Sequence, residues 1–219
     1  MSDHTAVVTA EHVAYLAART PAQDPFLADL KRAAAQAGLP AIWIAPEQAS
    51  YVQVLLKVAG AKRVVEVGTL GGYSAISMAR ALPDEGSVIT FELNPNHAEF
   101  AREWVARSDV AGRVEVRAAA GLEGLPELAD GSADAMLIDA NKDDYPAYVD
   151  HAARLLRPGG LLMVDNAFAF GQLFEDSPSD SGVAHIRAFN DWMALDSRFH
   201  AIIAAIGDGM WIGARETSQ

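Results

Sequence analysis

The chain has 219 residues, and 17 lysines and arginines against 29 aspartates and glutamates give it a formal net charge of −12. This acidity argues against proteins that gather nucleic-acid phosphates or anionic membranes by general electrostatic attraction. The absence of cysteine excludes disulfides, thiolate catalysis, Cys-ligated zinc and iron–sulfur clusters, while 51% hydrophobic residues are typical of a globular protein with a large core.

The first part of the chain is predicted to be helical. Apolar positions three and four residues apart predict helices over residues 10–19, 25–37 and 46–59. Pro40 and Pro46 bracket a short apolar connector between the last two. We expect residues 1–60 to form a helical cap on the rest of a single domain that spans residues 1–219.

No targeting or membrane-spanning segment is apparent in the sequence. The first ten residues lack the basic and apolar runs of a secretory signal. The apolar runs elsewhere are shorter than the ~20 residues that a membrane span requires. We therefore expect a cytoplasmic protein without membrane association.

From Lys62 onward, short aliphatic runs alternate with helical stretches. The expected strands cover residues 63–67, 87–92, 114–117, 135–139 and 161–166. The helices expected between them cover residues 72–81, 95–108, 122–129 and 145–156. Such alternation is typical of right-handed βαβ units and of a parallel sheet covered on both faces.

The C-terminal part predicts a helix over residues 183–195 and two strands over residues 199–205 and 210–214, which Gly207-Asp208-Gly209 separates. We expect this pair to form an antiparallel hairpin at the sheet edge. The predicted fold class is α/β, with a doubly wound, mostly parallel, seven-stranded, Rossmann-like sheet in residues 61–219. Ligands bind such sheets beyond the carboxyl ends of the strands.

The first expected strand ends in a glycine-rich turn, Gly68-Thr69-Leu70-Gly71-Gly72-Tyr73-Ser74. Glycines let the backbone approach a ligand, and a helix N-terminus near Ser74 suits an anionic group. Position 70 is not a glycine, so the G-x-G-x-x-G pattern that cradles a dinucleotide pyrophosphate is absent. The turn is not a P-loop either, since no G-K-[ST] follows.

Two acids flank this turn. Glu92 ends the second expected strand, where an acid in a doubly wound fold commonly binds ribose hydroxyls. Glu66 lies beside the turn, where a carboxylate would repel a pyrophosphate but pair with an ammonium group. An adenosyl ligand with an amino-acid tail, S-adenosylmethionine, fits both acids and the turn together. Taken singly, Glu66 is equally typical of an ordinary strand-end acid and Glu92 of a helix cap.

Polar residues also end the fourth and fifth expected strands. Asp139 follows one apolar run, and Asp165 and Asn166 follow the next. Neighbouring parallel strands lie about 4.8 Å apart, so these oxygens should converge. They suit a hard divalent ion, Mg²⁺ first, with Mn²⁺ or Ca²⁺ as alternatives. Lys142, three residues after Asp139, could serve as a general base beside a metal-held hydroxyl.

Each of these residues also has a simpler interpretation. Asp139 alone is equally typical of a strand end, Asp165-Asn166 of a turn, and Lys142 of a solvated surface position. The prediction depends on their coincidence at neighbouring strand ends. Three aromatic residues that follow the proposed metal site could form a pocket wall or pack their own loop, namely Phe168, Phe170 and Phe174.

Between Tyr15 and Ala214 the chain resembles the cation-dependent, S-adenosylmethionine-dependent O-methyltransferases. This family includes catechol and caffeoyl-CoA O-methyltransferases, and the likeness is greatest to its small bacterial members. The matching motifs are Pro46-Glu47-Gln48, the run from Glu66 to Ser74, Glu92-Leu93-Asn94-Pro95, Ile138-Asp139-Ala140-Asn141-Lys142, Leu156-Arg157-Pro158-Gly159-Gly160, Val164-Asp165-Asn166 and Ile206-Gly207-Asp208-Gly209.

The resemblance implies a class I methyltransferase fold and a role for each site residue. Asp139, Asp165 and Asn166 would ligate the metal, and Lys142 and Asp139 would be the catalytic residues. The residues predicted to bind the methyl donor are Ile44, Glu66, Gly68, Thr69, Gly72, Ser74, Glu92, Ala120 and Asp139. Among them, Glu66, Gly68 and Ser74 would hold the methionine portion with the backbone near Ile44, Glu92 the ribose, and Ala120 the adenine.

The chain departs from the family pattern at three places. Asn141 stands where many relatives have a second acid, and Ile42 replaces a frequent methionine near the donor. The segment 167–171 lacks the tryptophan that is common after the Asp-Asn pair.

The sequence therefore predicts a Mg²⁺-dependent O-methyltransferase that acts on a small, catechol-like phenol and forms a homodimer. A hydroxylated RNA base is an alternative acceptor, against which the net charge argues. A non-catalytic adenosyl-binding module and a nicotinamide-dependent dehydrogenase are further alternatives.

Overall fold

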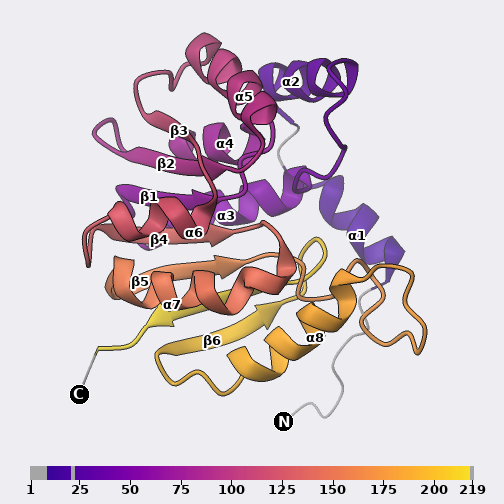
Figure 1. Cartoon of the computed structure of the whole chain (residues 1–219). Coiled ribbons are helices and arrows are strands. Elements are labelled where there is room, and N and C mark those ends of the chain that lie inside the picture. The colour runs from indigo at the N-terminus through magenta and orange to yellow at the C-terminus, as the bar shows by residue number, and fades with distance from the viewer. Residues whose placement is uncertain (1–8, 21–22, 218–219) are drawn as a thin grey trace.

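The computed structural model describes residues 9–20 and 23–217. These residues form a seven-stranded sheet of order β3-β2-β1-β4-β5-β7-β6 (Figure 1). The first five strands are parallel, and β7 runs antiparallel to both β5 and β6. The predicted fold class is thus confirmed. The strands are β1 (Arg63–Val67), β2 (Ser87–Glu92), β3 (Val114–Ala118), β4 (Ala133–Ile138), β5 (Leu156–Val164), β6 (Phe199–Ala204) and β7 (Met210–Arg215).

Helices surround this sheet. Proline occupies the first turn of the second, third and fifth helices, where its missing N–H leaves no hydrogen bond unmade. No helix of the described chain is both long and apolar enough to cross a membrane. The helices are α1 (Ala10–Ala17), α2 (Pro25–Gln36), α3 (Pro46–Val58), α4 (Tyr73–Ala81), α5 (Pro95–Arg107), α6 (Gly121–Gly124), α7 (Tyr145–Leu155) and α8 (Gly182–Met193), with the 3₁₀ turns η1 (Leu125–Glu127) and η2 (Lys142–Asp144).

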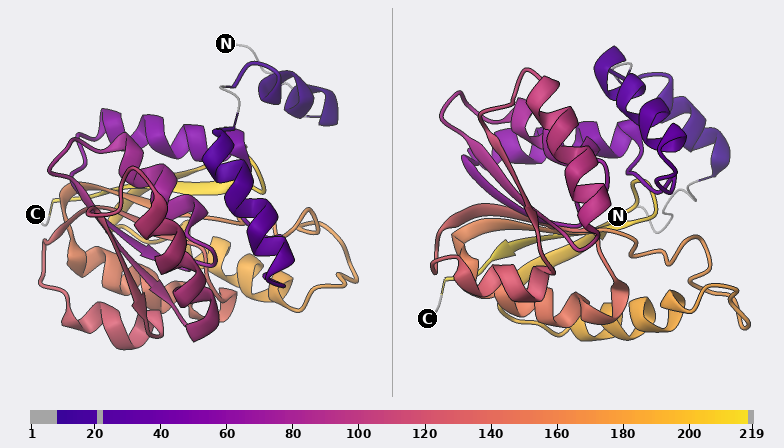
Figure 2. Two further views of the ribbon diagram at one scale, coloured as in Figure 1. Left: turned by 90° about the horizontal axis from the view of Figure 1, so that it is seen from above. Right: turned by 45° about the horizontal axis from the view of Figure 1, so that its top comes forward.

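The sheet separates two apolar cores, because successive strand residues point to opposite faces. Val64 and Leu137 belong to the core that α2, α3, α4 and α5 cover. Val65 and Ile138, the next residue on each strand, belong to the core that α7 and α8 cover. Figure 2 shows these two helical layers on either side of the sheet. All six residues of β4 are buried, as expected for a central parallel strand.

One predicted helix is wrong. The pattern over residues 122–129 predicted a continuous helix, but the structure has the single turn α6 followed by the 3₁₀ turn η1. Pro126 lacks the N–H that a continuing helix would need. Gly124 also packs so closely on Phe91 that any Cβ there would overlap the ring. Local sequence and tertiary packing together therefore shorten this element.

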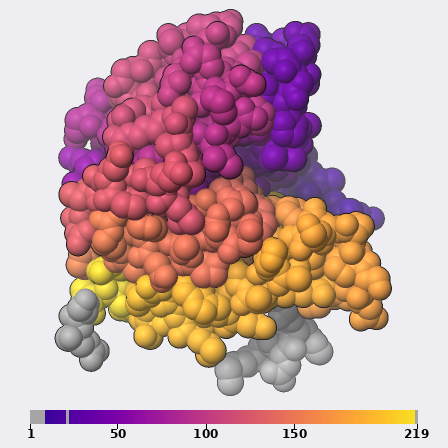
Figure 3. Space-filling view, viewed as in Figure 1, coloured from indigo at the N-terminus to yellow at the C-terminus, as the bar shows by residue number. Residues whose placement is uncertain are grey.

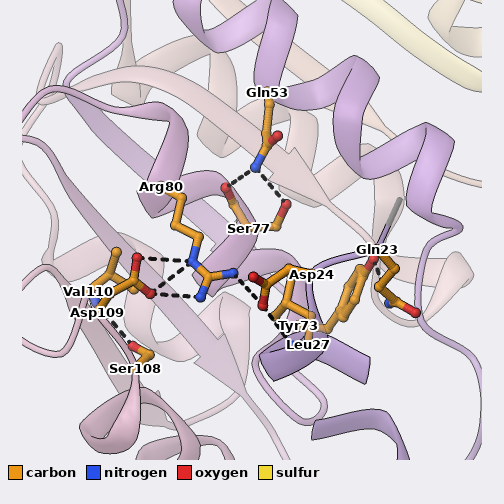
Figure 4. A network of polar contacts seen from close by, with 10 residues as sticks. All are labelled: Gln23, Asp24, Leu27, Gln53, Tyr73, Ser77, Arg80, Ser108, Asp109 and Val110. Carbon is orange, nitrogen blue, oxygen red and sulfur yellow. Dashed lines mark hydrogen bonds and ion pairs between the residues drawn. The ribbon is translucent and has the colours of Figure 1, made fainter. Parts of the chain in front are cut away.

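A polar network joins the start of α2 to α4 and to the loop after α5 (Figure 4). Arg80 on α4 pairs with Asp109 at 2.7 Å and with Asp24 at 3.2 Å. Asp24 is the N-cap of α2 and accepts a hydrogen bond from the N–H of Leu27. Beside it, Gln23 donates a hydrogen bond to the hydroxyl of Tyr73 at 3.1 Å. These contacts fix the N-terminal end of α2.

The N-terminal helices and the C-terminal elements occupy different regions of the face shown in Figure 3. In the space-filling view, the C-terminal part forms the lower band of the visible face, and the N-terminal helices lie at the upper right (Figure 3). The β6–β7 hairpin enters the sheet beside β5, with Val164 opposite Trp211. This pairing brings the turn between β6 and β7 to the carboxyl end of β5.

Candidate functional site

A cavity of about 1020 Å³ opens at the carboxyl ends of the parallel strands. Its wall comes from α2, the connector that contains Pro40 and Trp43, the turns after β1, β2, β3, β4 and β5, and the β6–β7 turn. The cavity thus lies where a doubly wound sheet binds its ligands. Among the predicted donor residues, the wall includes Ile44, Gly68, Thr69, Ser74, Glu92, Ala120 and Asp139, but not Glu66 or Gly72.

The glycine turn lies directly on the end of β4. Gly68 has φ +99° and lies so close to the backbone at the end of β4 that any Cβ would overlap the carbonyl oxygen of Asp139. Gly72, the N-cap of α4, has φ +86°. Both positions therefore require glycine, and the first lets the backbone form the cavity wall. Gly72 acts behind the wall, where it begins α4.

Glu66 is fully buried and only half satisfied. One of its carboxylate oxygens accepts a 2.5 Å hydrogen bond from the hydroxyl of Thr90. The other, Oε1, has no hydrogen-bond partner among the described residues. Burial raises the pKa of Glu66 to about 7. Since a buried oxygen without a partner is costly, this acceptor fits a ligand that brings a donor, such as an ammonium group.

Glu92 is held rigidly at the end of β2. Its two oxygens accept hydrogen bonds from the backbone N–H groups of Leu70, at 2.7 Å, and Asn94, at 2.9 Å. Each carboxylate oxygen has a further lone pair, so this side chain can still accept hydrogen bonds from two neighbouring hydroxyls. Its position on the cavity wall fits the predicted contact with a ribose.

The strand-end residues of β4 and β5 meet around an ammonium group. Lys142 donates hydrogen bonds to Asp139 Oδ1 at 3.1 Å, to Asn166 Oδ1 at 2.6 Å and to the hydroxyl of Tyr145 at 2.7 Å. Burial raises the pKa of Tyr145, so its hydroxyl keeps its proton. Two of the three predicted metal ligands therefore already face a positive charge.

Asp165 lies beside them but behind the cavity wall. Its backbone N–H donates a hydrogen bond to the carbonyl oxygen of Ile138, which places it next to Asp139. Its carboxylate accepts a 2.5 Å hydrogen bond from the amide of Gln48 on α3. Burial, and then the charge of Asp139, raise the pKa of Asp165. A cation bound beside Asp165 would favour the ionised carboxylate and so oppose both effects.

The donor set fits a hard cation. Within the described residues there is no cluster of three or more His, Cys, Asp and Glu side chains suited to a metal ion. The set here has two carboxylates and the amide oxygen of Asn166, and such oxygens are the ligands that Mg²⁺ and related ions prefer. The side-chain nitrogen of Lys142 already lies within hydrogen-bond distance of two of these oxygens.

Three contacting residues were not among the predicted site residues. Gln48 holds Asp165, Tyr145 holds Lys142, and Asp208 accepts a hydrogen bond from Asn166 at 3.1 Å. The only sequence signal for Asp208 was its place between two glycines in a matching motif. Of the three aromatic residues, Phe170 is on the cavity wall, whereas Phe174 is 92% exposed.

Comparison with known proteins gives the family. A family model described as O-methyltransferase matches residues 17–216. The chain belongs to the O-methyltransferase family. The predicted resemblance is therefore confirmed at this level, and the cavity is the active-site candidate of an O-methyltransferase.

Several relatives match this O-methyltransferase over most of its length. It is 36% identical over 184 residues to a catechol O-methyltransferase of Niastella koreensis, covering 83% of each chain. It is 40% identical over 171 residues to a catechol O-methyltransferase of Mycobacterium tuberculosis, covering 78% of each. Among solved structures, an O-methyltransferase from Bacillus cereus in complex with SAH is 32% identical, with a TM-score of 0.84 over 93% of this chain and 96% of that one.

Proposed function

We propose that this O-methyltransferase transfers the methyl group of S-adenosylmethionine to one hydroxyl of a catechol-like small molecule, with a divalent metal ion, Mg²⁺ first. The observation that carries the proposal is the meeting of Asp139, Asn166 and Lys142 at the wall of the same cavity that the glycine turn and Glu92 line. The names of the two catechol O-methyltransferase relatives support the acceptor class.

The donor half of the proposed site lies on β1 and β2. Glu66 would pair with the ammonium of the donor's amino-acid tail, which supplies the partner that Oε1 lacks. Glu92 would bind the ribose hydroxyls, and Ala120 would lie beside the adenine. Two solved structures of relatives support this donor. One is the Bacillus cereus O-methyltransferase in complex with SAH. The other is an O-methyltransferase from Streptomyces achromogenes in complex with SAM, which is 31% identical to this chain with a TM-score of 0.81.

The acceptor half lies on β4 and β5. Asp139, Asp165 and Asn166 would hold the metal ion. When bound, the metal would act as a Lewis acid that lowers the pKa of an acceptor hydroxyl, and the donor would supply an electrophilic methyl group. Lys142 Nζ, oriented by Tyr145, would accept the proton of that hydroxyl in its neutral amine form, which the positive charge of a neighbouring metal ion would favour. The cavity wall would keep the hydroxyl in line with the methyl group.

The test combines chelation with a catechol panel. We expect the purified protein to methylate catechols with labelled S-adenosylmethionine, to lose this activity with EDTA and to regain it with Mg²⁺. Non-vicinal diols such as resorcinol should react poorly because they cannot chelate the ion. Asp165→Asn, which keeps the side-chain shape, should lower turnover at least about 100-fold while donor binding persists.

Exposed Asp176 provides the matched control. Asp176→Asn removes the same charge further along the loop after β5 and should leave turnover unchanged. Methyl transfer that survives both chelation and Asp165→Asn would contradict the metal-dependent proposal.

A further inference from the structure

The turn between β6 and β7 brings a carboxylate to the proposed metal site. Asp208 lies between Gly207 (φ +55°) and Gly209 (φ +74°), and it is part of the cavity wall. A Cβ at Gly207 would overlap the side-chain amide of Gln48, and one at Gly209 would press on the ring of Phe168. Gly207 therefore lets this turn approach α3 closely, and Gly209 lets it approach the loop after β5.

The carboxylate of Asp208 accepts three hydrogen bonds from that loop, besides the 2.8 Å bond that its backbone carbonyl accepts from the N–H of Phe168. Its Oδ2 accepts one from the side-chain amide of Asn166 at 3.1 Å and one from the backbone N–H of Phe170 at 2.7 Å. Its Oδ1 accepts one from the N–H of Gly171 at 3.1 Å. All three partners lie within residues 166–171, which follow β5.

This loop needs such an anchor because its backbone is strained. Asn166 has φ +66°, Ala169 +54° and Phe170 +58°, all in the left-handed region that residues with side chains rarely adopt. Conformations of this kind persist only where the surrounding structure holds them. The N–H groups of Phe170 and Gly171 point to Asp208, so its carboxylate is the group that holds this part of the loop.

The same carboxylate decides which end of the Asn166 amide faces the cavity. An ionised carboxylate only accepts hydrogen bonds, so the NH₂ end of the amide must face Asp208. The oxygen end then faces Lys142, to which it lies at 2.6 Å. With the amide turned over, two N–H groups would point at the ammonium, and at any cation that took its place.

We propose that Asp208 is a positioning residue for the cation site: it orients the oxygen of Asn166 as a ligand and anchors the strained loop 166–171. The proposal rests on the proposed function, because the cation is part of it. Neighbours of metal ligands commonly act in this way, and their loss lowers metal affinity between about 10-fold and 100-fold.

The experiment measures Mn²⁺ binding, by electron paramagnetic resonance, to the metal-free full-length protein. Asp208→Asn keeps the shape but loses the all-acceptor carboxylate, and we expect Mn²⁺ to bind about 10-fold or more weakly. Asp208→Glu keeps the charge but moves the carboxylate by one methylene, and it should weaken binding similarly. Asp176→Asn is the charge-matched control and should bind as the wild type does.

Two further measurements separate positioning from general damage. Calorimetric binding of S-adenosylmethionine should change less than about twofold in every variant, because the donor half lies on other strands. Hydrogen exchange without metal should be about tenfold or more faster at the amides of Phe170 and Gly171 in Asp208→Asn, since each loses a charged acceptor.

The outcomes are distinguishable. If Asp208→Asn binds Mn²⁺ as tightly as the wild type does, the positioning role is overturned. If only Asp208→Glu does so, the positioning role is also overturned, because a negative charge then suffices. Both results would leave the proposed function intact. Unchanged exchange at Phe170 and Gly171 would overturn the anchoring role. A wild-type protein that binds no Mn²⁺ and methylates catechols regardless of chelator would overturn both this proposal and the metal in the proposed function.

Discussion

At the scale of single residues, the buried carboxylate of Glu66 destabilises the folded protein when it is ionised. The carboxylate is fully buried, has one hydrogen bond, from Thr90, and has a pKa raised to about 7. Between its ordinary value of 4.5 and about 7, the folded protein keeps a proton that the unfolded chain has released. The free energy of unfolding should therefore fall by up to about 3 kcal/mol as pH rises through this window.

Glu66→Gln removes the ionisable group without changing its shape. We expect the variant to be more stable than the wild type at pH 8, by about 1–3 kcal/mol, and nearly equal to it at pH 5. Binding of S-adenosylmethionine should weaken about tenfold or more, because the ammonium loses a charged acceptor. Urea denaturation at the two pH values and calorimetry give both quantities.

Exposed Glu99 on α5 serves as the comparison. Glu99→Gln should change neither the donor affinity nor the pH dependence of stability. A stability difference for Glu66→Gln that is the same at pH 5 and pH 8 would show that the buried carboxylate does not titrate as described.

At the scale of elements, α2 is both part of the cap and part of the cavity. Leu30 on this helix lies on the cavity wall, and the helix leads into the connector with Trp43 and Ile44. Its N-terminal end depends on Arg80, whose side chain is 20% exposed and bridges Asp24 and Asp109 (Figure 4). Arg80 is in the last turn of α4, away from Ser74 on the cavity wall, so we expect a change there to affect the proposed donor site through α2.

Arg80→Met keeps an unbranched, apolar stem and removes the bridge. We expect the free energy of unfolding to fall by about 1–2 kcal/mol, because Asp24 and Asp109 lose a charged partner. Amide exchange across α2 should accelerate, and donor affinity should fall several-fold. Arg32→Met breaks the exposed ion pair with Asp29 on the same helix, and it should change neither the amide exchange of α2 nor the donor affinity. If Arg80→Met leaves the donor affinity unchanged, the position of α2 does not affect donor binding and the prediction is wrong.

The sequence located most elements because their signals are local. Strands β1 and β2 occur at the predicted residues, since each is a short aliphatic run between turn residues. Asp139, Asp165 and Asn166 could be placed at neighbouring strand ends because each follows such a run. Their roles as ligands stay predictions.

The supporting contacts could not be predicted in this way. Gln48 reaches Asp165 across 117 residues, and Asp208 reaches Asn166 across 42. Neither partner is implied by periodicity or spacing, because both depend on how α3 and the last hairpin pack on the sheet. The helix predicted over residues 122–129 fails for a related reason, since close packing of Gly124 on Phe91 overrides a local pattern.

At the scale of the whole molecule, α1 is a short helix that buries none of its side chains against the rest of the described chain. It has eight residues, none of them buried, and it carries Val13, Tyr15 and Leu16 at 46%, 58% and 44% exposure. Figure 2 shows it at the periphery of the fold. Isolated helices shorter than about 12–15 residues are marginal in water. We propose that a second copy of the chain covers this apolar surface.

Light scattering after gel filtration tests the homodimer. We expect the wild type to have twice the 23.3 kDa mass of one chain. Leu16→Asp should shift it toward one chain, because a charge would be buried in the contact. Glu11→Gln, a change at another exposed position of α1, should leave the mass unchanged. A wild-type protein with the mass of a single chain would contradict the proposal.

The position of the β6–β7 turn also sets an order of assembly. The proposed donor-binding positions lie between Ile44 and Asp139, whereas Asp208 is synthesised much later and reaches Asn166 only when β7 has paired between β5 and β6. During synthesis the N-terminal part of a chain leaves the ribosome first. The proposed acceptor half therefore stays incomplete in a nascent chain until the last hairpin has emerged.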